Sequence, residues 1–402
     1  MPQQQLKIAF LVPSNSISGG LFVAYRHAHF LATAGHDVVV IFQHGHDPAA
    51  SVPYPDFALR RFSIFDAELQ YREFDLVVSC WWECFYGMFF LRSRRYAHFI
   101  QGDDREACRA QSGGHHKDEA LIRFAFSHPR VGYLAVARWL TEKLAQDCNI
   151  IAGYCPNGID NSRFNRNVTP LEPKGARPRI LIEGPGALSF KRVGLAYEVA
   201  ARFPDCEIWH VCSDGVYQPH WQAHRRFTGV SMAEMPRIYA ACDVLLKLSQ
   251  VEGFFGPPLE MMACGGLCVV GRVKGMEEYI VEGENALVVH GDAVEEAVGK
   301  LRQLLSDPAL QAKLRKAGAE TALRLDWSLQ APKFAAAIRE IVAGQVPWHD
   351  VETAAMRKLA GAALGGRFAT GGAELRRGGS IGGTVRRMLA ALLPGMQAGG
   401  SD

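Results

Sequence analysis

The chain has 402 residues, 48% of them hydrophobic, and a formal net charge of +3. This length predicts two or three domains, and the hydrophobic content is enough for complete cores. A charge so close to neutral gives no general argument for a nucleic-acid partner, and we expect none. No apolar run approaches the length of a membrane span, and the N-terminus does not resemble a signal peptide.

The first half of the chain alternates between strand-like and helical patterns. Residues 7–12 are a short apolar run, typical of a buried parallel strand. A helical pattern over residues 21–34 follows and ends at Gly35. Further strands are expected at residues 38–42, 76–79, 96–100 and 132–136. The pattern predicts a first Rossmann-like domain over residues 1–165.

The second half restarts the same pattern. Residues 165–178 contain Asn, Pro, Lys and Gly without periodicity, which predicts a linker. Strands are expected at residues 179–182, 207–211, 244–248, 267–270 and 286–289, with helices between them. These elements predict a second domain over residues 179–330, followed by a helix at 327–343.

The last segment, residues 349–402, is rich in glycine, alanine and arginine. We expect one helix at residues 351–363 and an amphipathic piece around 385–393. One interpretation is a peripheral membrane contact at the inner face of the membrane. Its basic residues would be Arg376, Arg377, Arg386 and Arg387. The other, favoured because paired glycines interrupt any long helix, is a partly disordered, solvated tail.

Ten cysteines are scattered along the chain without a Cys-x-x-Cys pair. Several lie in apolar strand-like runs, where cysteine behaves as a small hydrophobe. We therefore expect buried, reduced thiols, a cytoplasmic location and no metal site. A zinc site at the pairs Cys80/Cys84 and Cys264/Cys268 is the minor alternative.

The most informative segment is residues 252–266, where Glu252 and Glu260 have seven residues between them. The intervening Gly-rich turn and Pro-Pro pair predict a helix that begins near Pro257, with Glu260 on its first turn. Free N–H groups at such a helix start bind anions such as phosphate. Carboxylates would repel a bare anion, so we expect them to bind hydroxyls. A ligand with a central phosphate and hydroxyls on both sides is a nucleotide sugar.

This segment resembles the E-x7-E motif of retaining GT-B glycosyltransferases of the family 4 type. Other matching signatures occur in the family's order, at residues 155–160, 238–249, 269–275, 278, 283–289 and 291–292. The resemblance covers roughly residues 6–330. It implies two Rossmann-like α/β domains that face a cleft, with a helix at residues 331–348 that returns to brace the N-terminal domain.

The family resemblance implies a retaining, metal-independent transfer of a hexose or deoxyhexose. The donor would be a nucleotide sugar, bound by the C-terminal domain, and the acceptor a glycan or lipid-linked glycan on the N-terminal side. No D-x-D sequence, the usual metal-binding signature of the alternative fold, occurs in the chain. The pattern around Trp81 and Gln101 is similar to that of bacterial surface-polysaccharide transferases, including rhamnosyltransferases.

The same resemblance implies the donor-binding residues. Glu260 would bind the ribose hydroxyls and Glu252 the donor sugar. Lys191 matches a family lysine, whereas Pro185 stands in place of the family arginine and Arg192 is the candidate to compensate. The phosphate contacts would be the backbone amides of Phe254, Phe255 and Gly256 and the Gly19–Gly20 turn. The alternatives without a binding role are that Lys191 is a solvated surface lysine and that Glu260 only stabilises its helix.

The N-terminal domain is expected to supply the acceptor side. Gln101 occupies about the position of a family histidine, and Asp103 or Asp104 could receive the acceptor proton. An N-cap of a helix over residues 105–110 is the equal alternative for Asp104. The His115–His116 pair is expected in a loop. The departures at Pro185 and Gln101 motivate a rival hypothesis, a non-catalytic scaffold that only binds nucleotide sugars.

Overall fold

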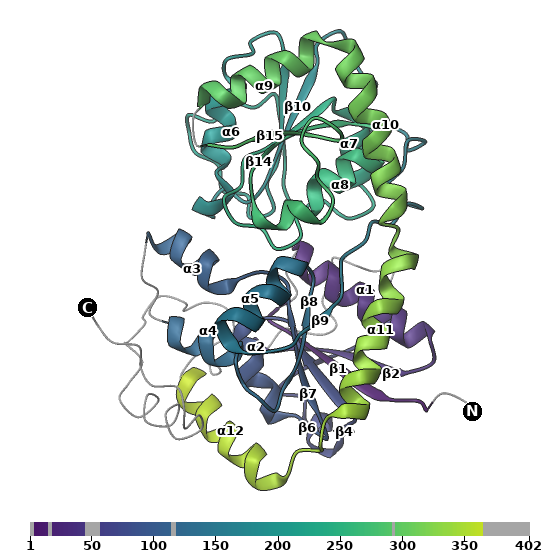
Figure 1. The fold of residues 1–402 in the computed structure, drawn as a ribbon, viewed down its shortest axis with the longest axis vertical. Helices are drawn as coiled ribbons and strands as arrows, with labels where there is room; N and C mark the ends of the chain where they lie inside the picture. Colours follow the sequence, from purple (N-terminus) through teal and green to yellow (C-terminus); the bar gives the residue numbers. More distant parts are fainter. Residues whose placement is uncertain (1–3, 15–17, 45–56, 114–117, 292–293, 365–402) are drawn as a thin grey trace.

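The computed structural model describes residues 4–14, 18–44, 57–113, 118–291 and 294–364. Two α/β domains are stacked along the long axis of the molecule (Figure 1), each built on a parallel sheet. The expected two-domain architecture is confirmed. No helix in the described part of the chain combines the length and apolar character needed to cross a membrane. The predicted basic tail arginines and the His115–His116 loop lie outside the described residues.

The N-terminal sheet has seven parallel strands in the order β3-β2-β1-β5-β7-β8-β9. The strands are β1 (Lys7–Val12), β2 (Asp37–Phe42), β3 (Arg60–Ser63), β5 (Leu76–Ser79), β7 (Tyr96–Ile100), β8 (Gly132–Ala135) and β9 (Gly153–Tyr154). The helices are α1 (Gly19–Thr33), α2 (Trp82–Gly87), α3 (Asp104–Ser112), α4 (Glu119–Ala125) and α5 (Arg138–Cys148). Central strands such as β1 are apolar because helices cover both faces of the sheet.

The C-terminal sheet has six parallel strands in the order β12-β11-β10-β13-β14-β15. The strands are β10 (Arg179–Glu183), β11 (Glu207–Val211), β12 (Arg225–Phe227), β13 (Val244–Lys247), β14 (Leu267–Gly271) and β15 (Leu287–Val289). The helices are α6 (Val193–Ala200), α7 (Met235–Ala241), α8 (Gly256–Ala263), α9 (Val294–Ser306) and α10 (Pro308–Arg324). One buried cluster packs side chains of β10, β13, β14 and β15 against helices α6 and α9.

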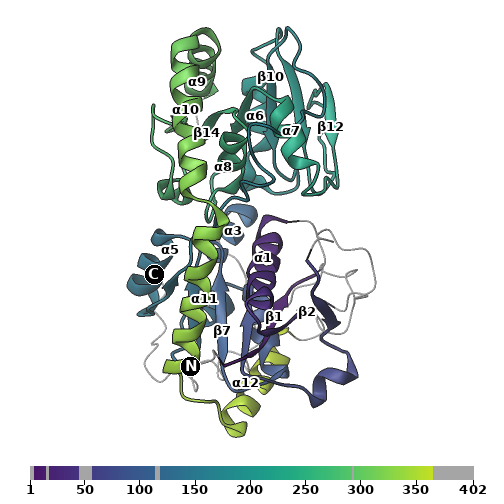
Figure 2. The same ribbon diagram turned by 90° about the vertical axis from the view of Figure 1, so that its right-hand side faces the viewer.

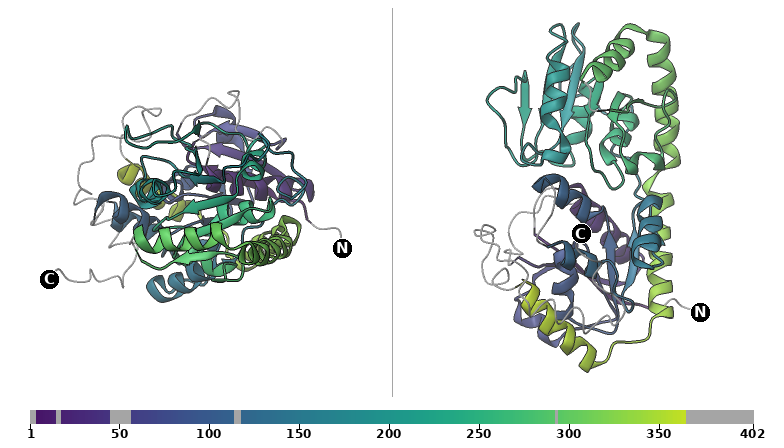
Figure 3. Two further views of the ribbon diagram at one scale, coloured as in Figure 1. Left: turned by 90° about the horizontal axis from the view of Figure 1, so that it is seen from above. Right: turned by 60° about the vertical axis from the view of Figure 1, so that its left-hand side comes forward.

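Helix α11 (Trp327–Gly344) returns to the N-terminal domain, as expected. Figure 2 shows α10 and α11 following one another along one side of both domains. The Phe334 ring of α11 stacks on Phe10 of β1 with centroids 6.0 Å apart. Helix α12 (Asp350–Leu364) then packs under the same domain, where Arg357 Nε donates to the Phe89 carbonyl at 2.7 Å. Figure 3 shows the narrow waist where α3 approaches the upper domain.

Two details of the sequence-based description are wrong. Helix α8 begins at Gly256, in agreement with the expected start near Pro257, but its first turn holds no acidic residue, so Glu260 lies just beyond that turn. The N-cap of α3 is Asp103, whose carboxylate accepts from the Arg105 amide, and Asp104 is the first helical residue. Short strands are also additional to the prediction: β3, β9, β12 and the small pair β4 (Glu73–Phe74) and β6 (Arg92–Ser93). Each is polar or too short to show an apolar run.

Short 3-10 turns complete the fold at η1 (Ala67–Tyr71), η2 (Met88–Phe90), η3 (Ser189–Lys191) and η4 (Lys274–Glu278). All ten cysteines are free, and eight of them are buried. Among the described residues no group of three or more His, Cys, Asp or Glu side chains could hold a metal ion. The expectation of buried, unpaired thiols is therefore met.

Candidate active site

A cleft of about 530 Å³ lies between the two domains. On the N-terminal side it lies at the point where chain order reverses between β1 and β5, and on the C-terminal side between β10 and β13. Ligands of open parallel sheets bind at such switch points, at the carboxyl ends of the strands. The cleft therefore joins the preferred binding sites of both domains.

The loop from Glu252 to Phe255 enters the cleft and leads directly into α8. Phe255 caps the helix in the left-handed region with φ of 64°, a conformation that costs energy for a side chain of this size. The Tyr279 hydroxyl donates to the Phe255 carbonyl and holds the turn in place. Phe254, Phe255 and Gly256 all line the cleft, so the first N–H groups of α8 lie at its wall.

Four charged side chains form a cluster beneath this loop. Lys191 Nζ lies 2.9 Å from Glu252 Oε2, and Lys247 Nζ lies 2.5 Å from Glu183 Oε2 and 3.7 Å from Glu252 Oε1. Burial alone would raise the pKa of Glu252, but Lys191 and Lys247 outweigh it and lower that pKa below its usual value. Glu252 is therefore a buried carboxylate held between two lysines.

Glu260 lies in the same wall, on α8. The Tyr239 hydroxyl donates to Glu260 Oε2 at 2.8 Å. Burial raises the pKa of Glu260 to about 7, and the Tyr239 hydrogen bond only partly opposes this shift. The two glutamates of one motif thus have different protonation behaviour, because Glu252 has lysine partners and Glu260 has a phenol.

The N-terminal wall approaches this loop through backbone. Gln101 Nε2 donates to the Gly20 carbonyl at 3.0 Å, which joins the end of β7 to the start of α1. A Cβ added at Gly253 would overlap the Gln101 carbonyl oxygen, so only glycine allows the two segments to meet. Trp139 Nε1 donates to the Gly253 carbonyl at 2.8 Å and fixes the loop from the N-terminal side. Gly19, Gly20 and Gln101 line the cleft as predicted site residues.

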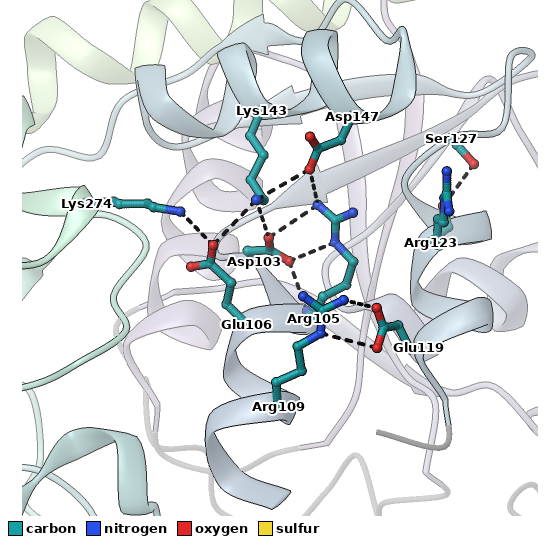
Figure 4. Close-up of polar contacts among 10 residues, drawn as sticks. All are labelled: Asp103, Arg105, Glu106, Arg109, Glu119, Arg123, Ser127, Lys143, Asp147 and Lys274. Atoms are coloured by element: carbon teal, nitrogen blue, oxygen red, sulfur yellow. Dashed lines mark hydrogen bonds and ion pairs between the residues drawn. The ribbon is translucent and has the colours of Figure 1, made fainter. Parts of the chain in front are cut away.

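Asp103 and Asp104 also line the cleft, in different environments. Asp103 accepts from the Arg105 amide at 2.9 Å and from the Arg105 guanidinium, with Lys143 Nζ 3.5 Å away. Figure 4 shows Asp103 inside this network, while Lys274 of the C-terminal domain reaches Glu106. Burial, with Asp103 next to it, raises the pKa of Asp104 well above its usual range. Asp103 thus has structural partners for both oxygens.

The remaining predicted residues separate into those within the cleft and those outside it. Lys191 and Pro185 line the cleft. Arg192 instead caps α6 with φ of 50° and lines a small cavity beside Gly271 and His290, so the structure does not bring it to the predicted site. Lys247 and Glu183 were missed. The signal available for them is a charged residue directly after the apolar run of a strand, at its carboxyl end.

The match to a known protein family lies in the C-terminal domain. Residues 217–321, which include the Glu252–Glu260 motif, match the family model described as "Glycosyl transferases group 1". A 90-residue stretch is 31% identical to a D-inositol 3-phosphate glycosyltransferase of Nocardiopsis dassonvillei, covering 22% of this chain and 21% of that protein. The chain spans less than half the length of the first curated relatives that it matches.

Solved structures match across both domains. Anabaena Alr3699/HepE, solved in complex with UDP-glucose, aligns with a TM-score of 0.69 at 14% identity, covering 84% of this chain and 100% of that one. WaaG, described as a glycosyltransferase involved in lipopolysaccharide biosynthesis, aligns with a TM-score of 0.64 at 17% identity, covering 84% and 100%. The fold is therefore the GT-B fold, and with the family match it supports a GT-B glycosyltransferase.

Proposed function

We propose that this protein transfers a sugar from a nucleotide-sugar donor to a hydroxyl of a glycan or lipid-linked glycan, with retention of configuration at the transferred carbon. One observation carries the proposal. The Glu252–Phe255 loop, backed by lysines, meets the Gln101–Gly20 contact across the cleft at the switch points of both sheets. Donor and acceptor groups held on opposite walls would react as one complex.

The donor's diphosphate would lie at the start of α8, bound by the amides of Phe254 to Gly256 and by Lys191. Glu260 would accept hydrogen bonds from the ribose hydroxyls, and Glu252 would lie at the sugar. The Gly19–Gly20 turn would approach the phosphates from the other wall. Since Lys191 and the start of α8 would provide the positive charge for the diphosphate, we propose that no metal is required.

In the proposed reaction, the bond between the sugar carbon and the phosphate oxygen breaks while the acceptor oxygen bonds to the same face of that carbon. The acceptor proton passes to the departing phosphate oxygen. Glu252 would stabilise the positive charge that develops on the sugar. The Asp103 carboxylate, predicted as a proton acceptor, would act here only if its bonds to Arg105 were released.

The sugar is proposed to be a hexose or deoxyhexose and the process to be bacterial cell-surface polysaccharide synthesis. The support is the resemblance around Gln101 to rhamnosyl-type transferases and the structural likeness to WaaG and to a protein solved with UDP-glucose. Free, buried cysteines agree with a reducing, cytoplasmic location.

The test is a calorimetric titration with UDP, GDP, ADP and dTDP in metal-free buffer, with Glu260→Ala as the control variant. We expect selective binding of one nucleotide, weakened in the variant. A wild-type protein that binds none of them would contradict the proposal. Binding without turnover or hydrolysis of the matching nucleotide sugars would favour the scaffold hypothesis instead.

A further inference from the structure

The buried ion pair between Lys247 and Glu183 has no part in the roles described so far. Both residues lie at the carboxyl ends of neighbouring strands, because the parallel register pairs Leu246 of β13 with Ile182 of β10. These two strands flank the switch point of the C-terminal sheet. The pair therefore lies directly beneath the place where the donor would bind.

Lys247 is buried to an unusual degree for a lysine, with its side chain 2% exposed. Nζ is bonded to the Glu183 carbonyl at 3.0 Å and to the Glu183 carboxylate. Both of these Glu183 oxygens lie closer to Nζ than Glu252 Oε1, which is 3.7 Å away. Glu252 Oε1 is buried and has no hydrogen-bond partner within the described chain. A short movement of Nζ would let Lys247 bond to this oxygen.

Lys191, in contrast to Lys247, is already bonded to Glu252. Its Nζ lies 2.9 Å from Glu252 Oε2, so the cation expected to bind the diphosphate is already paired with a carboxylate. Pro185 leaves the family's arginine position without a charge. Moving Lys191 to a phosphate would leave the buried Glu252 carboxylate with Lys247 alone, 3.7 Å from Oε1. Its charge would then be poorly compensated unless Lys247 came closer.

We propose that Lys247 is a positioning residue that neutralises Glu252 when the donor arrives, and thereby frees Lys191 to bind the diphosphate. The inference rests on the proposed function, since it assumes a nucleotide donor in this cleft. In this arrangement Lys191 exchanges one anion for another and Glu252 keeps a cation. In the absence of ligand, the ion pair with Glu183 keeps the buried Lys247 charged and close to Glu252.

The experiment is a double-mutant cycle on binding of whichever of UDP, GDP, ADP or dTDP binds the wild-type protein. Removing Lys247 alone would leave Glu183 without its partner, so the pair is removed together as Glu183→Gln/Lys247→Met. We expect about 10- to 100-fold weaker binding, as for loss of a charged hydrogen bond. In a Glu252→Gln background, where no charge needs to be neutralised, the same change should alter affinity by less than about 3-fold.

Lys174→Met is the matched control. Lys174 forms an ion pair with Asp243 at 2.9 Å, at the opposite end of the same two strands, and should leave nucleotide affinity unchanged. Equal losses from the pair deletion in both backgrounds would mean that Lys247 contacts the phosphates itself and would overturn the inference. So would wild-type affinity in Glu183→Gln/Lys247→Met. Absence of binding in the wild type would instead refute the proposed function, so the two failures are distinguishable.

Discussion

The two walls of the cleft are built in different ways. The C-terminal wall presents charged side chains: Lys191, Lys247, Glu183 and Glu252 form one cluster, and Glu260 on α8 accepts from Tyr239. The N-terminal wall presents mostly backbone, at Gly20 and around Gln101, and its conspicuous carboxylate Asp103 is bonded to Arg105. In this site, the C-terminal domain supplies the charged side chains, and the N-terminal domain supplies backbone that lies close to the Glu252–Phe255 loop.

This difference has a physical reason. Phosphates need positive charge and free N–H groups, which the start of α8 and the lysines provide in one domain. The opposite wall has to lie close enough to the donor to exclude water from the reacting atoms. Backbone segments that meet through glycine do so without a side chain between them. The predictions below test whether the two roles can be separated.

The largest effect is expected for Glu252→Gln, which removes the charge but keeps the shape. If Glu252 stabilises developing charge on the sugar, the rate of transfer should fall about 10²- to 10³-fold. Nucleotide affinity should change much less, because the released Lys191 remains available to the diphosphate. The measurement is kcat beside the calorimetric Kd for the same protein. A variant that keeps its rate would show that the charged wall does not carry the chemistry.

A smaller but separate loss is expected for Gly253→Ala. The added Cβ would overlap the Gln101 carbonyl and hold the walls apart. Transfer should fall about 10- to 100-fold. Nucleoside diphosphate binding, most of whose proposed contacts lie on the C-terminal wall, should fall much less. Gly299→Ala is the control, because its Cβ on α9 would meet nothing within 4 Å. Parallel losses of binding and transfer would contradict the division between the walls.

The contrast between the walls also shows how far the sequence could be interpreted. Glu252 and Glu260 were predictable because a turn and a helix start place them within one segment, whereas Lys191 was assigned from the family resemblance. Lys247 and Glu183 were not predictable, because they are 64 positions apart and meet only through the order of strands in the sheet. The role of Asp103 depends on Lys143 and Arg105, and Lys143 lies on a different helix, α5. Local spacing cannot show such partners.

Glu260 should make nucleotide binding depend on pH. Its pKa is raised to about 7 by burial, so the carboxylate that accepts ribose hydroxyls forms as the pH rises through 7. Affinity should increase about 10-fold between pH 6 and 8, beyond the change due to the nucleotide's own phosphate. Glu260→Gln, measured at the same pH values, isolates that part. An identical pH profile in wild type and variant would remove Glu260 from the ribose site.

The same pKa shift affects stability with a definite sign. Because the folded protein holds a proton on Glu260 that the unfolded chain has lost, the free energy of unfolding should fall as the pH rises from the usual value of 4.5 to about 7. Glu260→Gln should show a flatter dependence over that interval in denaturant titrations. The same dependence in wild type and variant would mean that burial does not raise this pKa.

The smallest effect on catalysis is expected for Asp103→Asn, although the residue lines the cleft. Asp103 caps α3 and accepts from the Arg105 guanidinium, so the change should lower the free energy of unfolding by about 1–3 kcal/mol. Transfer by the folded protein should change by less than about 3-fold, because both carboxylate oxygens already have structural partners. Chemical denaturation and kcat at low temperature separate the two quantities. A large fall in kcat at unchanged stability would instead make Asp103 the proton acceptor, and would place part of the chemistry on the wall that otherwise supplies only close approach.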